Sequence, residues 1–421
     1  MRKTGINNDM SGFLLIFLTF ILIYLFVTNR YGWLVAFVLI FFRVLLSIIY
    51  KVSPVLYSHH SLILLTFYAL ILYVKRNDKD ILYVRYISNP VVLAMLLLSV
   101  VIVSQDAFSP FIDTHSAEIF DFEFNFSINT LFPVFTLPFF LSSKELDEFV
   151  NSFLFWSILY LLIVVFAFNL DVHEIAIDRT LLEEATDSFV STIPLSRYAG
   201  IAAIVSLSFF LFQDNNKLRT ISIFSFLFSS FVLLVAGQRG SLIGFIIAFV
   251  FLCFKSESRF RIHLTIFAVL AVLLMISLFD FGIFNRMEQL KGYQQFDRYN
   301  DYFKVWSIFE KNNYLWGLGA KGYFFETGRS YPHNIILEHI VNYGILGLLS
   351  ILTILVSCVK YCLFFLRKKD CFAEVTICAC WLLLAFSVMV SGGMNGNKIF
   401  YLFSALLAFS YLNEVATPEN C

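Results

Sequence analysis

The residues best suited to bind an anion lie in the longest polar interruption of an otherwise apolar sequence, residues 280–334. This stretch contains Arg298, Arg329 and His333. The planar guanidinium group of arginine donates paired hydrogen bonds to phosphate or carboxylate oxygens, and histidine can exchange a proton near neutral pH or donate to a phosphate oxygen. We therefore expect this stretch to be the working part of the protein and to bind an anion.

His333 stands directly before a long apolar run. Asn334 is a suitable N-cap for that predicted helix, because its side chain can accept hydrogen bonds from first-turn N–H groups, and Pro332 keeps Tyr331 extended. The positive end of the helix dipole then points toward His333, which favours a bound anion. The alternative is an ordinary solvated loop histidine, and the arginines of the same loop favour function over that alternative.

Two further arginines lie at the ends of apolar runs. Arg239 stands between two such runs with almost no loop and is flanked by Gly237 and Gly240, while Arg197 begins its own run. A charge at the bilayer centre costs about 2.5–3.5 kcal/mol and is usually paired or functional. Each arginine therefore either extends to the lipid headgroups or faces a cavity and holds an anionic group of a lipid ligand.

An amphipathic helix is predicted after Arg298. Its apolar residues recur at spacings of three and four, at Tyr302, Val305, Trp306 and Phe309. Such a stripe is typical of a packing face, and a helix lying on the membrane or on the helix bundle would hold Arg298 over the mouth of the bundle.

The segment Gly317–Gly322 has the glycine spacing G-x-G-x-x-G. A dinucleotide site needs a strand before this motif and a helix after it in a βαβ unit, whereas here a predicted helix precedes it. We interpret the glycines as a tight turn. No spacing of cysteines or histidines matches a metal site, so the sequence offers no metal cluster.

The sequence predicts that membrane helices hold these residues in place. The 421-residue chain is 59% hydrophobic, has a mean hydropathy of +0.80 and is 14% charged, compared with about 25% in soluble domains. Its continuous apolar runs are long enough to cross a bilayer as helices, whereas a membrane β-barrel would show short alternating segments. The predicted fold is an all-α polytopic membrane protein, and the zero net charge gives no argument for nucleic acid binding.

We predict a single membrane domain, residues 1–421, with about 12–13 transmembrane helices and one large loop, residues 280–334. The apolar runs are Phe13–Val27, Trp33–Ile49, Leu62–Val74, Val91–Val103, Ile128–Leu141, Phe149–Phe168, Leu195–Phe212, Ile221–Val235, Ser241–Phe254, Leu264–Phe279, Ile335–Val356, Cys371–Val390 and Ile399–Tyr411.

The charges of the connecting segments predict an orientation. Lysine and arginine concentrate in cytoplasmic loops, and basic loops alternate across these runs with acidic ones, of which Ser104–Ser127 is an example. The pattern places Arg239 and the large loop on the outer side and the C-terminus inside. Thirteen runs then put the N-terminus outside, against its own basic residues, so either one of the first three runs does not cross fully or Trp33–Ile49 is broken near Arg43.

Three segments, in this order, resemble the O-antigen polymerase/O-antigen ligase superfamily of membrane proteins that transfer lipid-linked glycans. They are Gln238–Ser241 at the opening of one run, Arg298–Gly319 in the large loop, and His333–Gly347 entering the next run. The resemblance extends from Leu195 to Leu349.

This resemblance implies a GT-C-like inverting glycosyltransferase of the bacterial inner (cytoplasmic) membrane, with a large periplasmic loop and an active face in the periplasm. Donor and acceptor would be oligosaccharides on undecaprenyl pyrophosphate, with no metal or nucleotide. His333, with Arg239, would be catalytic by activating the acceptor hydroxyl or orienting the leaving group. The residues implied to bind pyrophosphate are Arg239, Arg298, Arg197 and Arg329, with Asn334, Glu338 and Tyr299 in support.

Within the superfamily we favour an O-antigen polymerase, because the 52 phenylalanines and sparse polarity resemble divergent Wzy-type polymerases. An O-antigen ligase, which moves the glycan to lipid A core, and a protein O-oligosaccharyltransferase stay open, since fold resemblance does not determine function. A transporter or flippase is the alternative from another class, although the sequence lacks the internal symmetry common in transporters. The resemblance also implies a partner that regulates polysaccharide chain length.

Overall fold

The computed structural model describes residues 80–104, 109–141, 143–162, 192–236, 238–256, 300–311, 314–329, 331–368, 371–390 and 393–416, together with residues 28, 32–34, 263, 266 and 270. The predicted runs Phe13–Val27 and Leu62–Val74 lie outside the described residues, as do most of two others, Trp33–Ile49 and Leu264–Phe279. Arg298, Tyr299 and Gly237 also lie outside them.

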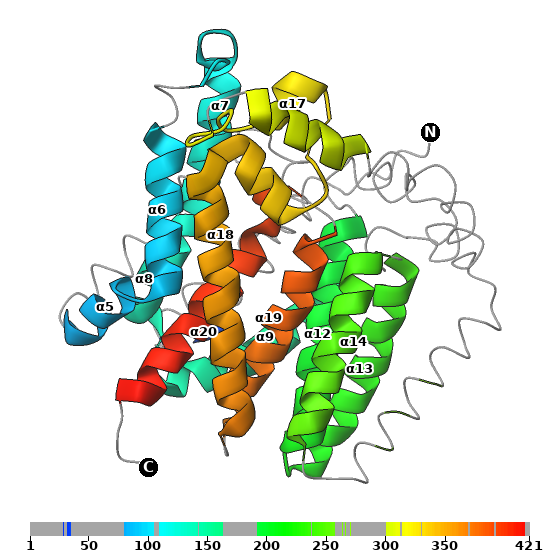
Figure 1. The fold of residues 1–421 in the computed structure, drawn as a ribbon. Helices are drawn as coiled ribbons and strands as arrows, with labels where there is room; N and C mark the ends of the chain where they lie inside the picture. The colour runs from blue at the N-terminus through cyan, green and yellow to red at the C-terminus, as the bar shows by residue number, and fades with distance from the viewer. Residues whose placement is uncertain are drawn as a thin grey trace, which may run out of the picture.

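The described residues form helices joined by short connections, and no strand occurs among them. The helices, labelled in Figure 1, are α5 (Asp80–Ile87), α6 (Pro90–Ser104), α7 (Ile112–Phe126), the π-helical turn η2 (Ser127–Leu131), α8 (Phe132–Phe140), α9 (Ser143–Leu162), α12 (Thr192–Phe212), α13 (Asn216–Ala236), α14 (Arg239–Lys255), α17 (Gly322–Thr327), α18 (Ile335–Arg367), α19 (Phe372–Val388), the 3₁₀ turn η4 (Met394–Asn397) and α20 (Lys398–Ala416). Residues 300–311 are also helical.

These helices have the length and composition of membrane spans. α12, α13 and α18 are long and apolar enough to cross a bilayer, and α6 and α19 are shorter apolar helices. α18 leaves Leu352, Val356 and Leu363 exposed, as expected for side chains that face lipid acyl chains. The protein is therefore an all-α integral membrane protein, as predicted.

Burial identifies α12 as the internal helix of the bundle. Of its most apolar window, 94% is buried, against 44% for α13 and 39% for α18. α12 packs along α13, α9, α19 and α14, and Figure 1 shows it beside α13 and α14. Any polar group on α12 is therefore held inside the protein and away from lipid.

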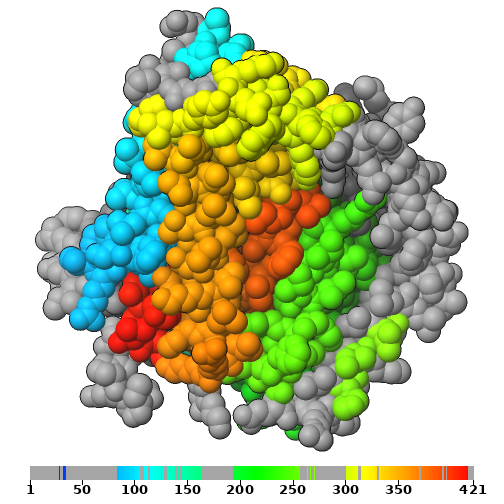
Figure 2. Space-filling model, viewed as in Figure 1, coloured from blue at the N-terminus to red at the C-terminus, as the bar shows by residue number. Residues whose placement is uncertain are grey.

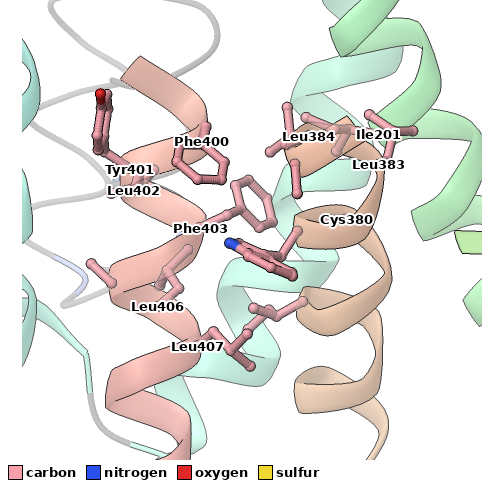
Figure 3. Close-up of a cluster of buried hydrophobic side chains, with 14 of the residues drawn as sticks. Ile201, Cys380, Leu383, Leu384, Phe400, Tyr401, Leu402, Phe403, Leu406 and Leu407 are labelled. Atoms are coloured by element: carbon pink, nitrogen blue, oxygen red, sulfur yellow. The ribbon is translucent and has the colours of Figure 1, made fainter. Parts of the chain in front are cut away.

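Large apolar side chains fill the space between α19 and α20. Figure 3 shows Phe400 and Phe403 of α20 directed toward α19, which contributes Leu384. The indole of Trp381 donates to Ser404 Oγ at 2.9 Å, which satisfies the polar edge of an otherwise buried ring.

Small residues let α14 approach α19 closely. Gly240, Gly244 and Ala248 follow one another at a spacing of four on α14. A Cβ on Gly244 would overlap the backbone of Leu383, and a Cβ on Gly200 of α12 would lie 2.6 Å from a methyl carbon of the same leucine. Small residues at this spacing allow helix backbones to come together in membranes, so α12 and α14 both press against α19.

The prediction was wrong for the acidic segment between residues 104 and 127, which we expected to be a loop. Ile112–Phe126 forms α7, which continues through η2 into α8. Ile119, Phe122 and Phe126 are buried at spacings of three and four, while Asp121 is exposed. Because acidic and aromatic residues are interleaved here, charge content concealed an amphipathic helix.

The glycine motif Gly317–Gly322 fastens the large loop to α18. The Leu318 N–H donates to Val341 O at 3.0 Å, and the Gly319 N–H donates to Asn342 O at 2.8 Å. Gly317 has a φ of 75°, and a Cβ there would lie 2.6 Å from the Asn342 backbone. Among the described residues the motif thus serves as a packing turn with no strand ahead of it, and Figure 2 shows the loop, in yellow, lying over the beginning of α18.

A kink in α18 receives this loop. Gly344 breaks the helical conformation, with φ 62° and ψ −153°, and the next residue, Ile345, donates its N–H to Tyr314 O of the loop at 2.8 Å. A loop carbonyl thus satisfies a backbone group that the kink removes from the helical ladder. The kink and the glycine motif together fix the loop against the first turns of α18.

Candidate functional site

Several helix ends meet at one end of the bundle. α12, α14 and α18 begin there and α19 ends there, and we name it the site end. Ser196 Oγ of α12 lies 2.9 Å from Ser241 Oγ of α14, which lies 3.1 Å from Ser387 Oγ of α19. Asn334, at the start of α18, donates from Nδ2 to Met389 O at 3.2 Å. Hydrogen bonds therefore connect all four helices at this end, on the same side of Figure 1 as α17.

Arg197 lies inside the site end and is 3% exposed. Its Nε donates to Ser387 Oγ at 2.9 Å, and its Nη1 donates to Gly396 O at 2.8 Å. Tyr331, which precedes α18, also interacts with this guanidinium electrostatically. Arg197 is therefore held between α12, the end of α19 and the connection to α20, and it does not extend to the lipid headgroups.

Arg239 is the first residue of α14 and is partly exposed. Its guanidinium group has no hydrogen-bond or ion-pair partner among the residues that the structure describes. The adjacent Gly240 packs on the end of α19, where a Cβ would lie 3.1 Å from Ser387 O and from Val390 Cβ. Arg239 thus belongs to the site end, with a side chain available to a ligand.

The structure confirms the predicted N-cap of α18 and shows His333 beside it. Asn334 Oδ1 accepts from the N–H groups of Ile336 at 2.9 Å and Leu337 at 3.2 Å. His333 has a φ of 57°, and its ring meets Tyr331 edge to face at 4.8 Å between centroids. A left-handed non-glycine residue is uncommon and often marks a functional site. His333 therefore stands next to the tyrosine that interacts with the buried arginine.

Glu338, in the first turn of α18, is a buried carboxylate and is 5% exposed. Its Oε1 accepts from the backbone N–H of Met394 at 2.8 Å and would lie 3.4 Å from a Cβ on Gly393. Its Oε2 is buried and has no hydrogen-bond partner in the described part of the chain. The short connection that binds Glu338 through Met394 also binds Arg197 through Gly396, so the carboxylate lies at the site end.

Arg329 is engaged within the large loop. Its Nη1 pairs with Asp301, whose carboxylate also accepts from the Tyr323 hydroxyl at 3.1 Å. Burial, together with the neighbouring Asp301 carboxylate, raises the pKa of Tyr323 to about 12. These contacts join residues 300–311 to α17. The pyrophosphate contact expected of Arg329 stays a prediction, as do the roles of Arg298 and Tyr299, which lie outside the described residues.

Sequence reasoning missed the serine chain and the connection between α19 and α20. The residues Ser196, Ser241 and Ser387 have no special spacing, and serine is common in membrane helices. The connection, residues 391–397, does carry a signal, because it places three glycines and two asparagines between two apolar runs. Such a segment turns tightly and offers backbone groups to side chains from other helices.

The assembled groups can stabilise an anion that forms at the site end. The N-termini of α12, α14 and α18 carry the positive ends of their helix dipoles, and Arg197 and Arg239 add formal positive charge. Glu338 and His333 can exchange protons next to that charge. The described residues contain no cluster of His, Cys, Asp and Glu that could hold a metal ion.

Part of the chain matches a known protein family. Residues 224–352 match the family model described as O-antigen ligase (Wzy_C). The matched segment includes Arg239, Arg329, His333 and Glu338, whereas Arg197 precedes it. No curated protein matches the chain. The match supports a place for this integral membrane protein in the O-antigen ligase/polymerase superfamily, over about a third of the chain.

Proposed function

We propose that the protein is a glycosyltransferase that moves an oligosaccharide from undecaprenyl pyrophosphate to an acceptor hydroxyl, and that it acts as an O-antigen polymerase joining lipid-linked repeat units. The observation that carries this proposal is the convergence of Arg197, Arg239 and His333 at one end of the bundle. Membership of the superfamily suggests the class of reaction, and the site end offers the groups that such a reaction needs.

The two arginines suit a departing pyrophosphate. Hydrogen bonds to Ser387 and Gly396 hold Arg197 in place before any substrate arrives, and a preorganised cation stabilises developing charge without reorganising. Arg239, with no partner among the described residues, can turn toward a phosphate. Loss of one such donor typically lowers the rate about 10²–10³-fold.

His333 suits the exchange of hydrogen bonds at the same centre. In an inverting transfer, the acceptor oxygen bonds to C1 of the donor sugar while the bond from C1 to the phosphate oxygen breaks. His333 can either accept the proton of the acceptor hydroxyl or donate to the leaving phosphate. Its place at the N-terminus of α18 favours an anion beside it.

The distribution of charge supports a periplasmic site in a bacterial inner membrane. α14 ends at Lys255 and α18 ends at Arg367, both at the end of the bundle opposite the site, where Lys255 donates to Lys368 O. Lysine and arginine concentrate in the cytoplasmic connections of membrane proteins. The site end would then open toward the periplasm.

A ligase is the second candidate, because the matching family model is described as O-antigen ligase. The deciding experiment incubates purified protein in nanodiscs with lipid-linked repeat units extracted from the source cells. A ladder of polymer without any other acceptor supports a polymerase, and product that forms only after lipid A core is added supports a ligase. Movement of the lipid-linked glycan between leaflets without any new glycosidic bond would instead support a flippase and refute the proposal.

Loss of His333 should remove the long glycans. His333→Ala is expected to abolish the ladder while the protein stays in the membrane, because the histidine precedes the α18 cap and the cap itself is retained. Full-length ladders from this variant would contradict a catalytic role. A chain-length regulator added to the wild-type reaction should narrow the distribution of ladder lengths.

A further inference from the structure

We infer that Glu338 Oε2 accepts the proton of the acceptor sugar hydroxyl, which leaves His333 to bind the departing pyrophosphate. This inference rests on the proposed function and names the residue that performs one of its steps.

The two oxygens of the Glu338 carboxylate have different surroundings. The Met394 N–H holds Oε1 at 2.8 Å, so the group has a fixed orientation. Oε2 is buried and has no partner in the described part of the chain, and Glu338 forms no ion pair there. Buried polar atoms are almost always hydrogen-bonded, so this oxygen is suited to a partner that arrives with the substrate, and a sugar hydroxyl is a donor of the right kind.

The position of Glu338 relative to the cation fits an inverting transfer. The turn η4 (Met394–Asn397) contacts Glu338 at its first residue and Arg197 at Gly396. Proton acceptor and cation are therefore held on two parts of one short turn. An inverting reaction needs a proton acceptor and a cation that are apart from each other, because the acceptor oxygen and the leaving phosphate lie on opposite faces of the donor sugar.

The tyrosines near Glu338 are poorer proton acceptors. Tyr343 of α18 and Tyr401 of α20 interact with its carboxylate electrostatically, and Tyr331 lies against Gly393 beside it. These tyrosines are neutral hydroxyls near neutral pH. His333 stands ahead of the helix N-terminus, where a phosphate is the favoured neighbour.

The proposed step conserves atoms and charge. The acceptor oxygen forms the new bond to C1 while its proton moves to Glu338 Oε2. The bond from C1 to the phosphate oxygen breaks, and its electron pair remains on the pyrophosphate beside Arg197 and Arg239. When the product leaves, Glu338 releases the proton to solvent and the carboxylate is restored.

The first test measures the rate of the nanodisc protein against pH with lipid-linked repeat units. Glu338→Gln keeps an oxygen that can accept from Met394 and removes the base, so we expect kcat to fall about 10²–10⁴-fold with an unchanged KM for donor. The wild-type kcat should fall toward acidic pH as the base is protonated, and this fall should be absent from the residual rate of Glu338→Gln. The matched control, Glu326→Gln, alters an exposed glutamate of α17 and should leave both unchanged.

Two results would overturn the inference. One is a kcat of Glu338→Gln that equals the wild-type value. The other is a residual rate of Glu338→Gln that still falls toward acidic pH, which would mean that His333 accepts the proton. If Glu338→Gln does not reach the membrane, Glu338→Asp replaces it, because it keeps a carboxylate on a shorter side chain. The kcat of Glu338→Asp should be lower than that of the wild type and should still fall toward acidic pH. A wild-type kcat in this variant would show that the position of the carboxylate does not matter, against the inference.

A second measurement does not depend on turnover. Infrared difference spectra record the carboxyl bands of the protein as free oligosaccharide, released from its lipid, is added. We expect a shifted band in the wild type that is missing from Glu338→Gln. If the wild type transfers no glycan at all, the proposed function fails, and the absence of a Glu338-dependent band in these spectra would separately overturn the inference.

Discussion

Alanine substitutions at Arg197 and Arg239 should have different effects, although the two side chains carry the same charge. We expect Arg197→Ala to lower stability and Arg239→Ala to lower the rate of catalysis. Arg197 is buried and donates to Ser387 and Gly396. Arg239 is partly exposed, and the described residues offer it no partner. Arg197→Ala therefore removes structural bonds together with a charge, whereas Arg239→Ala removes the charge alone.

The hydrogen bonds set the size of this difference. A hydrogen bond made by a charged group contributes about 1.5–3 kcal/mol, so the two bonds of Arg197 predict a loss of about 3–6 kcal/mol in unfolding free energy. Total stabilities of about 5–15 kcal/mol are usual, so the yield of folded Arg197→Ala should drop. Arg239→Ala should change stability by less than about 0.5 kcal/mol, while its rate falls about 10²–10³-fold because a donor to the leaving phosphate is lost.

Thermal unfolding in detergent, monitored by size-exclusion chromatography, measures the loss of stability. Ladder formation from lipid-linked repeat units measures the loss of rate. Arg197→Lys is the control, because it keeps a charge without the geometry of both hydrogen bonds, and it should be intermediate in stability. If Arg239→Ala unfolds as early as Arg197→Ala, then Arg239 is a structural residue. If Arg239→Ala keeps the wild-type rate, the electrostatic argument is refuted.

Further predictions concern the elements that hold the site. Gly244→Ala should destabilise the fold by about 1–3 kcal/mol, because its Cβ would overlap the backbone of α19. Gly396→Ala, with open space around its Cβ, should not change the unfolding temperature in the same thermal assay. Equal unfolding midpoints for the two variants would contradict the packing argument. Asn334→Ala should cost about 1 kcal/mol through loss of the N-cap, with Asn334→Asp retaining most of the stability; a neutral alanine would mean that the cap is dispensable. Tyr323, with a pKa raised to about 12 from the usual value near 10, favours its neutral form in the folded protein, so its contribution to stability is complete below pH 10 and is lost as the pH rises through 12. Tyrosinate absorbance of the wild type minus Tyr323→Phe should therefore titrate near 12, and a midpoint near 10 would contradict burial beside Asp301.

Most of the described spans could be predicted because hydropathy is a local property. The predicted runs that begin at Val91, Leu195 and Ile221 correspond to α6, α12 and α13. The bounds of each helix lie within a few residues of the bounds of the predicted run. α7 escaped because its acidic residues dominate the composition, although Phe122 and Phe126 form a buried face. Periodicity, which composition averages away, is the signal that would have found it.

The candidate site was only partly accessible to the same reasoning. Asn334 could be assigned as a cap because capping depends on the next three residues alone. Arg197 and Arg239 could be singled out because charge near a bilayer is costly. The free oxygen of Glu338 could not, since it depends on where a turn nearly sixty residues later in the chain, at Met394, meets α18.

Local patterns were enough to predict a helical membrane protein with arginines near its apolar runs and a histidine just ahead of a capped helix, because hydropathy, capping and the cost of a charge near lipid all act over short stretches of chain. Only the tertiary structure decided that Arg197, Ser241, Ser387 and Glu338 share one end of the bundle. That arrangement depends on which helix faces pack together, and the close approach at Gly244, along with the packing of α19 against α20, is a matter of shape between distant segments that no local pattern encodes.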